Sequence, residues 1–287
     1  MPHMGTPQPG LRGAGFRPSD VSGPARCSVF VAHRRHLQEG HGDLLDTRET
    51  ERCRRYRIAA DRDRFTLATV LLRAVAGRIT GVEASAVVVD RICDSCGDPH
   101  GRPRLPGTGL QVSISHSGDV VAVAITPAGP VGVDIEQLGS VHSDLVTTVC
   151  TGSELRHVGT AADFYAYWTR KEAVLKATGE GLRRRMTSIE VTAPGARPAL
   201  VSLDSGEALA CRMADVRIAG YSGAVAVLTA AHVSFDVCDA AWLLPASPGG
   251  VRAATATSGT SDAAQRSRNY QQADRAALRR ERGLQCA

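Results

Sequence analysis

A chain of 287 residues with 43% hydrophobic but only 4% aromatic residues has room for one large or two moderate domains around an aliphatic core. Its formal net charge of +5 suggests an anionic ligand or partner without demanding nucleic acid. We expect a cytoplasmic protein, because no apolar run approaches the ~18 residues of a membrane span, no secretory signal opens the chain, and the cysteines are scattered.

The first part of the chain predicts a leader, a strand and a basic helical region. Residues 1–26 are rich in Gly, Pro and Ser, which favours a disordered leader. A strand is expected at 29–32, and a helical pattern runs from Arg48 to Ala76. The stretch from Arg48 to Arg64 holds seven arginines and four acids. It is either a solvated helix face or a phosphate cradle, since Arg grips phosphate oxygens bidentately.

A short strand predicted at 86–89 is followed by a loop that carries two cysteines and a histidine. Cys93 and Cys96 form a C-x-x-C pair, His100 follows, and the Gly and Pro residues around them indicate a loop. Zinc is one interpretation, but a structural zinc site takes four ligands, and no second C-x-x-C or H-x-x-x-H occurs in the sequence. A tight turn with reduced thiols is therefore favoured.

A hairpin is predicted from strand patterns at 112–118 and 120–125. His116 lies near its turn, between Ser115 and Ser117. A lone histidine is more often structural than functional. Its position between two hydroxyl residues at a loop also makes an anion donor plausible.

Two carboxylates alternate along the next strand pattern, at 131–138. Alternation directs the apolar side chains to the core and Asp134 and Glu136 to the opposite face. The pair is either a solvent-facing strand edge or a platform for Mg²⁺, because neighbouring carboxylates repel unless a cation lies between them.

The two lysines of this chain, Lys171 and Lys176, lie within six residues of each other, although Lys plus Arg number 34. The segment from Asp163 to Thr178 contains no Gly or Pro and predicts a helix. On such a helix Glu172 and Lys176 are one turn apart on one face. A surface ion pair is the ordinary interpretation, yet the exclusive use of lysine here points to chemistry.

The remaining sequence predicts further strands and a tail. Strands are expected at 189–191, 199–203, 209–216 and 224–228. From residue 246 onward Ser, Gly, Thr, Ala and Arg dominate, which favours a largely disordered tail with a weak helix around 274–282.

Taken together, these motifs resemble those of the 4′-phosphopantetheinyl transferases. Gly132–Glu136 and the Trp168–Leu182 segment are similar to the two signature motifs of that family. Ser115-His116-Ser117, Gly101-Arg102-Pro103 and the helix entry at Arg52–Arg64 are similar to further family motifs. The resemblance runs from about residue 29 to about residue 228, and the length fits the monomeric, surfactin-synthetase-activating type.

The resemblance implies an α+β fold of two similar α/β subdomains in a pseudo-twofold arrangement, with the active site in the cleft between them. We assign 27–128 to the N-terminal subdomain on the coenzyme A side. Residues 129–245 form the expected C-terminal subdomain with the metal-binding and catalytic motifs, and 246–287 form a low-complexity tail.

The resemblance also implies an activity: Mg²⁺-dependent transfer of 4′-phosphopantetheine from coenzyme A to a serine of an apo acyl or peptidyl carrier protein, with release of 3′,5′-ADP. Polyketide, nonribosomal peptide or fatty-acid carriers are the expected partners. The implied coenzyme-binding residues are Arg52, Arg102, Ser115, His116 and, more weakly, Lys171; the implied metal ligands are Asp134, Glu136 and Glu172; and the implied catalytic residues are Glu172, as proton acceptor, and Lys176.

One position departs from the family pattern. Glu49 stands where some members carry a basic phosphate contact, so Arg48 is the expected substitute.

Two alternatives belong to other classes. A basic module that binds nucleic acid would use the arginines of 48–64 and of the tail. Sparse aromatic residues and the paired carboxylates argue against it. A zinc-stabilised interaction protein would use the Cys93 loop instead.

Overall fold

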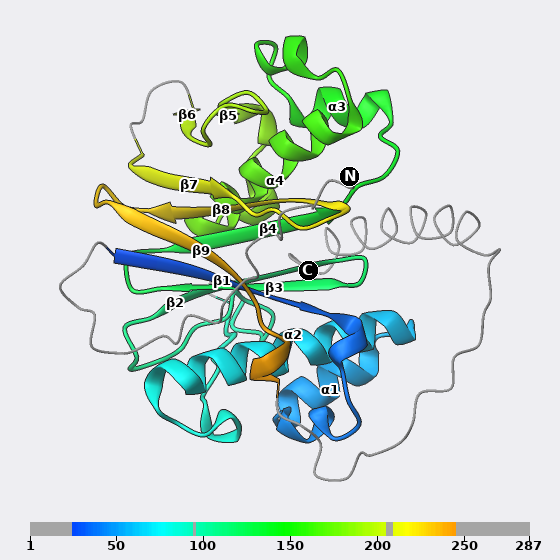
Figure 1. The fold of residues 1–287 in the computed structure, drawn as a ribbon, viewed down its shortest axis with the longest axis vertical. Helices are drawn as coiled ribbons and strands as arrows, with labels where there is room; N and C mark the ends of the chain where they lie inside the picture. Colours follow the sequence, from blue (N-terminus) through cyan, green and yellow to red (C-terminus); the bar gives the residue numbers. More distant parts are fainter. Residues whose placement is uncertain (1–24, 94–95, 205–208, 245–287) are drawn as a thin grey trace, which may run out of the picture.

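A computed structural model describes residues 25–93, 96–204 and 209–244 of the chain. Its layers follow the order helix, sheet, sheet, helix, with α1 and α2 outside one sheet and α4 outside the other (Figure 1). The mixed α+β fold class predicted from the sequence is confirmed. The helices are α1 (Thr47–Arg55), α2 (Ala59–Thr80), α3 (Ser143–Val149) and α4 (Ala161–Thr178). The strands are β1 (Ala25–His33), β2 (Gln111–Ser117), β3 (Val120–Thr126), β4 (Val131–Gln137), β5 (Ile189–Val191), β6 (Leu200–Leu203), β7 (Cys211–Asp215), β8 (Tyr221–Leu228) and β9 (Val233–Asp239).

The first sheet has the strand order β2-β3-β1-β9 and is covered by α2. The helical pattern predicted from Arg48 to Ala76 forms two helices, because the chain is extended at Tyr56 and at Ile58. α1 begins at a capping box formed by Asp46 and Glu49. The aliphatic face of α2 packs on β1 and β3 and makes the first core.

The second sheet has the order β4-β8-β7 and is covered by α4. α4 begins at a capping box formed by Thr160 and Asp163, and it ends where Gly179 takes a left-handed conformation with φ of 77°. The helix predicted from Asp163 to Thr178 is therefore confirmed, with two further residues at its start.

A third core, made almost entirely of Val and Ala side chains, fills the space between the two sheets. Val131, Val133 and Ile135 of β4 belong to it, whereas Asp134 lies on the face that meets α4. The alternation predicted for this strand is confirmed. Its polar face is also covered, however, because a helix rather than solvent lies against it.

The edges of the two sheets meet where β2 runs beside β4, and serine side chains join them. The hydroxyl oxygens of Ser113, Ser115 and Ser117 accept hydrogen bonds from backbone N–H groups of β4, at N···O distances of 3.1, 3.2 and 3.0 Å. The donors are Val133, Ile135 and Gln137, in that order. The two residues of each pair are twenty positions apart, so β2 and β4 run parallel in a constant register. Serine hydroxyls accept the hydrogen bonds that backbone carbonyl oxygens accept in an ordinary sheet.

Two parts of the chain differ from the prediction. Residues 86–89 form no strand; after a 3-10 turn at Ala84–Ala86 the chain has only an isolated bridge between Asp90 and Arg104, because no neighbouring strand runs alongside it. β9 was not predicted. It falls in the segment assigned to the C-terminal subdomain, yet it pairs in parallel with β1 of the first sheet.

The leader lies outside the described residues up to residue 24, as do the tail and the weak helix at 274–282; Ala25 and Arg26, assigned to the leader, begin β1. Within the described part of the chain, no helix combines the length and apolar character needed to cross a membrane.

The close contact between α4 and β4 depends on Gly132, which predicts a specific loss of stability. A Cβ atom at residue 132 would overlap the carbonyl oxygen of Ala173 and lie 2.6 Å from the backbone nitrogen of Ala177. We expect Gly132→Ala to lower the free energy of unfolding by about 1–3 kcal/mol, because helix backbone cannot yield as a side chain does. Urea denaturation measures the change.

Gly42→Ala is the matched control. Nothing lies within 4 Å of a Cβ atom at that position, and its φ is not positive. Its unfolding free energy should stay within about 0.5 kcal/mol of the parent value. Equal effects of the two substitutions would contradict the role given to Gly132.

Candidate active site

The candidate site lies where α4 crosses β4 at the seam between the sheets. Lys176 donates three hydrogen bonds there: to the carboxylate of Asp134 at 2.7 Å, to the carbonyl oxygen of Val133 at 3.0 Å and to the hydroxyl of Ser115 at 3.1 Å. Burial lowers the pKa of Lys176, but Asp134, Glu172 and Glu136 outweigh it, so the pKa is raised overall. The lysine is therefore charged at neutral pH, in contact with Asp134 and within the field of the Glu172 and Glu136 charges.

Serine hydroxyls from β2 orient two of these carboxylates. Ser115 donates to Asp134 Oδ1 at 3.0 Å, and Ser117 donates to Glu136 Oε2 at 2.8 Å. The same hydroxyls accept the backbone N–H groups of β4, so each serine is fixed from two sides. The sequence analysis placed Ser115 near the coenzyme; its contacts here are to the acid and to Lys176. Ser117 was not assigned a role.

The site brings three acids to one region, but the described carboxylate oxygens of Asp134, Glu136 and Glu172 do not all lie within 4.8 Å of one another, so a divalent cation would draw them together on binding. Asp134 is 4% exposed, and its Oδ2 atom is buried without a hydrogen-bond partner among the described residues. Burial raises the pKa of Asp134 and outweighs the lowering effect of the neighbouring Lys176 ammonium. Three carboxylates facing one ammonium leave a formal excess of two negative charges, and oxygen donors of this kind suit Mg²⁺.

His116 lies at the end of β2 with its side chain exposed. Although the residue keeps an exposed surface, the protein atoms around the imidazole lower the pKa of His116 to about 4 by desolvation, and the positive charges of Arg64 and Lys176 act in the same direction. Arg64 reaches this place from α2, where it donates to the carbonyl oxygen of Gly118 at 2.9 Å. Arg64 was not singled out from the sequence.

Two arginines of the first half have buried nitrogen atoms without partners. Arg52 packs over the ring of Phe65, 5.4 Å from its centre, and its Nη1 atom is buried and has no hydrogen bond within the described residues. The same holds for Nε of Arg91. Burial, followed by the charge of Arg52, lowers the pKa of Arg91 to about 10. The carboxylate of Glu49 also acts on Arg91, but the two partnerless N–H groups among the described residues could still receive an anion; we call Arg52 and Arg91 the arginine seat.

Arg102 connects the first half of the molecule to the end of α4. Its Nη1 atom donates to the carbonyl oxygen of Ala177 at 3.4 Å. Together with residues 103–107 and 109–112, it lines an open groove. Arg102 therefore lies at the junction of the two halves, close to the helix end that carries Lys176.

Lys171 does not belong to the site, and the phosphate contact suggested for it is wrong. Its side chain is fully buried in the second half, where it donates to Glu154 at 2.5 Å and to the carbonyl oxygens of Val149 and Met186 at 2.7 and 3.1 Å. Helix periodicity explains the difference, because Lys171 points to the core side of α4 while Glu172 and Lys176 share the face toward β4.

Glu49 has a structural role. It accepts a hydrogen bond from Arg73 at 2.8 Å within the first half, and it is 5% exposed. The neighbouring Arg48, expected to substitute for a basic contact here, is exposed.

A family model described as the 4′-phosphopantetheinyl transferase superfamily matches residues 130–226. Over these residues, about a third of the chain, the protein is similar to that superfamily. The matched segment contains β4 and α4, and with them the three acids and Lys176.

Curated relatives in the superfamily extend the match into the first half. The chain is 31% identical to 4′-phosphopantetheinyl transferase HetI of Nostoc over 155 residues, 51% of this chain and 64% of that protein. It is 27% identical to a 4′-phosphopantetheinyl transferase of Bacillus subtilis over 169 residues, 55% of this chain and 72% of that protein. A phosphopantetheinyl transferase of Thraustochytrium is 31% identical over 191 residues, 60% of each chain. The matches thus span between 60% and 72% of these relatives.

Among solved structures, holo-[acyl-carrier-protein] synthase of Thermotoga maritima aligns with 35% of this chain and 62% of that chain, at 23% identity and a TM-score of 0.29. A TM-score at that level carries no argument about this fold.

The buried pair of Lys171 and Glu154 predicts a large effect on stability. Lys171→Met should lower the free energy of unfolding by about 3–5 kcal/mol, because it leaves the Glu154 carboxylate buried without its cation. Adding Glu154→Gln should recover part of that loss, since the buried group is then uncharged and its one carbonyl oxygen can still accept from the backbone N–H of either Thr151 or Val191. Chemical denaturation of both variants measures this.

One result would instead support a phosphate contact for Lys171. In that case Lys171→Met would unfold like the parent protein and bind coenzyme A more weakly.

Proposed function

We propose that this protein transfers the 4′-phosphopantetheine group of coenzyme A to a serine hydroxyl of an apo acyl or peptidyl carrier protein, and that it releases 3′,5′-ADP. The observation that carries the proposal is the gathering of Asp134, Glu136 and Glu172 around Lys176, inside the segment that matches the superfamily. The names of the relatives support the same activity.

Asp134, Glu136 and Glu172 are the residues that would hold Mg²⁺, and the partnerless Oδ2 atom of Asp134 supports this assignment. When bound, the ion supplies positive charge for the diphosphate and orients it. Ser115 and Ser117 keep two of the carboxylates in position. Asp134 and Glu136 come from β4 and Glu172 comes from α4, so strand and helix fix the backbone positions of all three acids.

The transfer step uses two residues of α4. The carrier serine oxygen forms a bond to the β-phosphorus of coenzyme A, and the bond from that phosphorus to the bridging oxygen of 3′,5′-ADP breaks. Glu172 accepts the proton of the serine hydroxyl. Lys176 stabilises the negative charge that develops on the leaving 3′,5′-ADP. Its ammonium is already held by three oxygen atoms, so little reorganisation is needed.

Coenzyme A would bind through the cations of the first half. Arg52 and Arg91 offer buried N–H groups that lack acceptors, which suits the 3′-phosphate. His116 and Arg102 would contact other parts of the coenzyme. The exposed imidazole of His116 can bind beside the adenine end, and Arg102 lies next to the end of α4. One chain contains both halves of this arrangement, so we propose a monomer.

Nucleic-acid binding is not the function that we propose. Several arginines of the basic stretch are engaged inside the protein: Arg62 donates to the carbonyl oxygen of Tyr56 at 2.9 Å, and Arg64 is buried. Grouped carboxylates at the seam would also repel a polyanion.

The transfer reaction predicts the behaviour of two α4 variants. With Mg²⁺ and coenzyme A, the parent protein should add the phosphopantetheine mass to an apo carrier protein. Glu172→Gln should slow the reaction by about 10²–10⁴, because the proton acceptor is lost. Lys176→Arg should slow it by about 10²–10³ although it keeps the charge, since a planar guanidinium cannot donate to the same three oxygens. Intact-protein mass spectrometry of the carrier measures the rates.

Glu83→Gln, at an exposed position far along the chain from these motifs, is the control and should react like the parent. A parent protein that modifies none of a panel of acyl and peptidyl carriers would refute the proposed activity. A normal rate for Lys176→Arg would refute the role given to the lysine.

The arginine seat predicts which phosphate the coenzyme places there. Arg52→Ala and Arg91→Ala should each raise the KM for coenzyme A about 10–100-fold, because a charge-assisted hydrogen bond is lost. The KM for 3′-dephospho-coenzyme A should hardly change. Arg54→Ala, an exposed arginine of α1, is the matched control. If the KM values for both coenzymes rise equally, Arg52 and Arg91 bind a part of the coenzyme other than its 3′-phosphate. That result would not contradict the proposed transfer reaction.

A further inference from the structure

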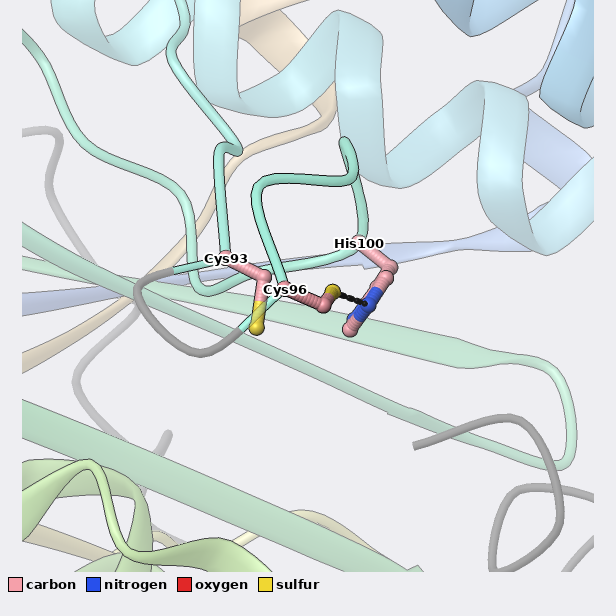
Figure 2. A group of neighbouring side chains, drawn as sticks. All are labelled: Cys93, Cys96 and His100. Atoms are coloured by element: carbon pink, nitrogen blue, oxygen red, sulfur yellow. Dashed lines mark hydrogen bonds between the residues drawn. The ribbon is translucent and has the colours of Figure 1, made fainter. Parts of the chain in front are cut away.

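The loop that follows residue 92 brings two thiols and an imidazole together on the surface of the first half. One donor atom each from Cys93, Cys96 and His100 lies within 4.8 Å of the others. Figure 2 shows the Cys96 sulfur facing the His100 ring, with the Cys93 side chain beside them. Cys96 Sγ and His100 Nε2 are 2.9 Å apart. None of these residues has a duty in the proposed transfer reaction.

The backbone around Cys96 is shaped to present both thiols on one side. Gly97 takes a left-handed conformation with φ of 79°, which side chains rarely adopt. Its N–H donates to the carbonyl oxygen of Cys93 at 2.9 Å, and the N–H of Cys93 donates to the carbonyl oxygen of Asp98 at 2.8 Å. The turn thus closes on itself in both directions and holds the two cysteines side by side.

A second glycine returns His100 to the cysteines. A Cβ atom at Gly101 would lie 2.7 Å from the carbonyl oxygen of Ile92 and 3.0 Å from Cα of Cys93. Its N–H donates to the carbonyl oxygen of Arg91 at 2.7 Å. Only a residue without a side chain allows the returning arm to pack this closely, and the close packing places the imidazole beside the thiols.

We propose that Cys93, Cys96 and His100 bind one Zn²⁺ ion, with water at the fourth position. Two thiolates and an imidazole form a donor set of borderline softness that zinc prefers over Mg²⁺. With metal–ligand bonds of about 2.0–2.3 Å, donors in a tetrahedral site lie about 3.5–3.8 Å apart, so the donors here need to move by only about 1 Å. On binding, the two thiols release their protons and His100 binds as neutral imidazole.

A zinc site here would differ from the tight turn with reduced thiols that the sequence favours. The sequence motif contains three possible zinc ligands, and the structure adds no fourth protein ligand among the described residues. The spatial arrangement adds what spacing alone could not provide, which is the convergence of the three on one point.

The metal would hold the loop that carries two of the candidate coenzyme-binding arginines. The base of the loop is closed by two hydrogen bonds between Asp90 and Arg104, of 3.0 and 2.8 Å. Arg91 and Arg102 lie just inside this base, and the metal site lies at the far end. Zinc would therefore fix the loop at both ends and keep the two guanidinium groups in place. This consequence rests on the proposed function, whereas the metal site itself does not.

The test begins with the full-length protein, purified under reducing conditions and equilibrated with Zn²⁺ in excess Mg²⁺, with unbound metal removed by gel filtration. Elemental analysis should find about one zinc per chain. Replacement by Co²⁺ should produce the thiolate-to-cobalt charge-transfer absorption and the intense visible bands of tetrahedral cobalt. Cys93→Ser, Cys96→Ser and His100→Asn should each lose most of the zinc, and the two serine variants should weaken the charge-transfer band.

Matched controls separate this site from other metal-binding groups. Cys211→Ser removes a half-buried thiol elsewhere, and His157→Asn removes an exposed imidazole. Both should retain the zinc. Asp134→Ala should also retain it, since that carboxylate belongs to the transfer site. Circular dichroism checks that every variant is folded, and thermal unfolding of the parent should shift upward by several degrees with zinc.

The proposal is overturned if the parent protein holds less than about 0.1 zinc per chain and gives no charge-transfer band with Co²⁺. It is also overturned if the serine variants keep their zinc, or if alkylation shows Cys93 and Cys96 joined as a disulfide under reducing conditions. None of these readings depends on carrier modification, so they stand apart from the proposed transferase activity. Removal of zinc should raise the KM for coenzyme A if Arg91 and Arg102 depend on the loop.

Discussion

The organisation of this protein depends on hydrogen bonds from one strand to the edge of another through serine side chains. Ser113, Ser115 and Ser117 take the place of carbonyl acceptors for the N–H groups of β4. This leaves the two sheets separate, so that a valine-rich core fills the space between them. The same hydroxyls are donors to Asp134 and Glu136. Ser115 and Ser117 therefore both join the two sheets and orient the acids, and for this reason the site lies where the sheets meet.

The two lysines illustrate how far a compositional signal reaches. Each ammonium group donates to three oxygen atoms: Lys176 in the site, and Lys171 in the core of the second half. A compact –NH₃⁺ group can donate in three directions, whereas the five N–H groups of arginine lie in a plane. The geometry therefore explains why a chain so rich in arginine keeps lysine twice. The sequence indicated that both positions matter, but it could not separate the structural lysine from the catalytic candidate.

Local patterns predicted most of the fold, and contacts between distant segments explain what they missed. The helix ending at Gly179 and the alternation in β4 follow from neighbouring residues alone. The candidate site was largely predicted because a motif fixed Asp134, Glu172 and Lys176 together. Arg91 could not be found, since its significance comes from burial beside Arg52. The absence of a strand at 86–89 has the same origin: β-propensity without a partner strand makes no sheet.

The return of β9 to the first sheet has a consequence for how the chain matures. β9 pairs with β1 along Ala25–Val31, so β1 acquires its second neighbour, after β3, only when residues 233–239 have left the ribosome. Until then one edge of β1 exposes backbone hydrogen-bonding groups that invite pairing with other chains. Nascent chains in which β1 has been synthesised but β9 has not would thus be targets for chaperones. For the same reason, a split-protein reporter cut at residue 128 would leave its N-terminal fragment with an open edge.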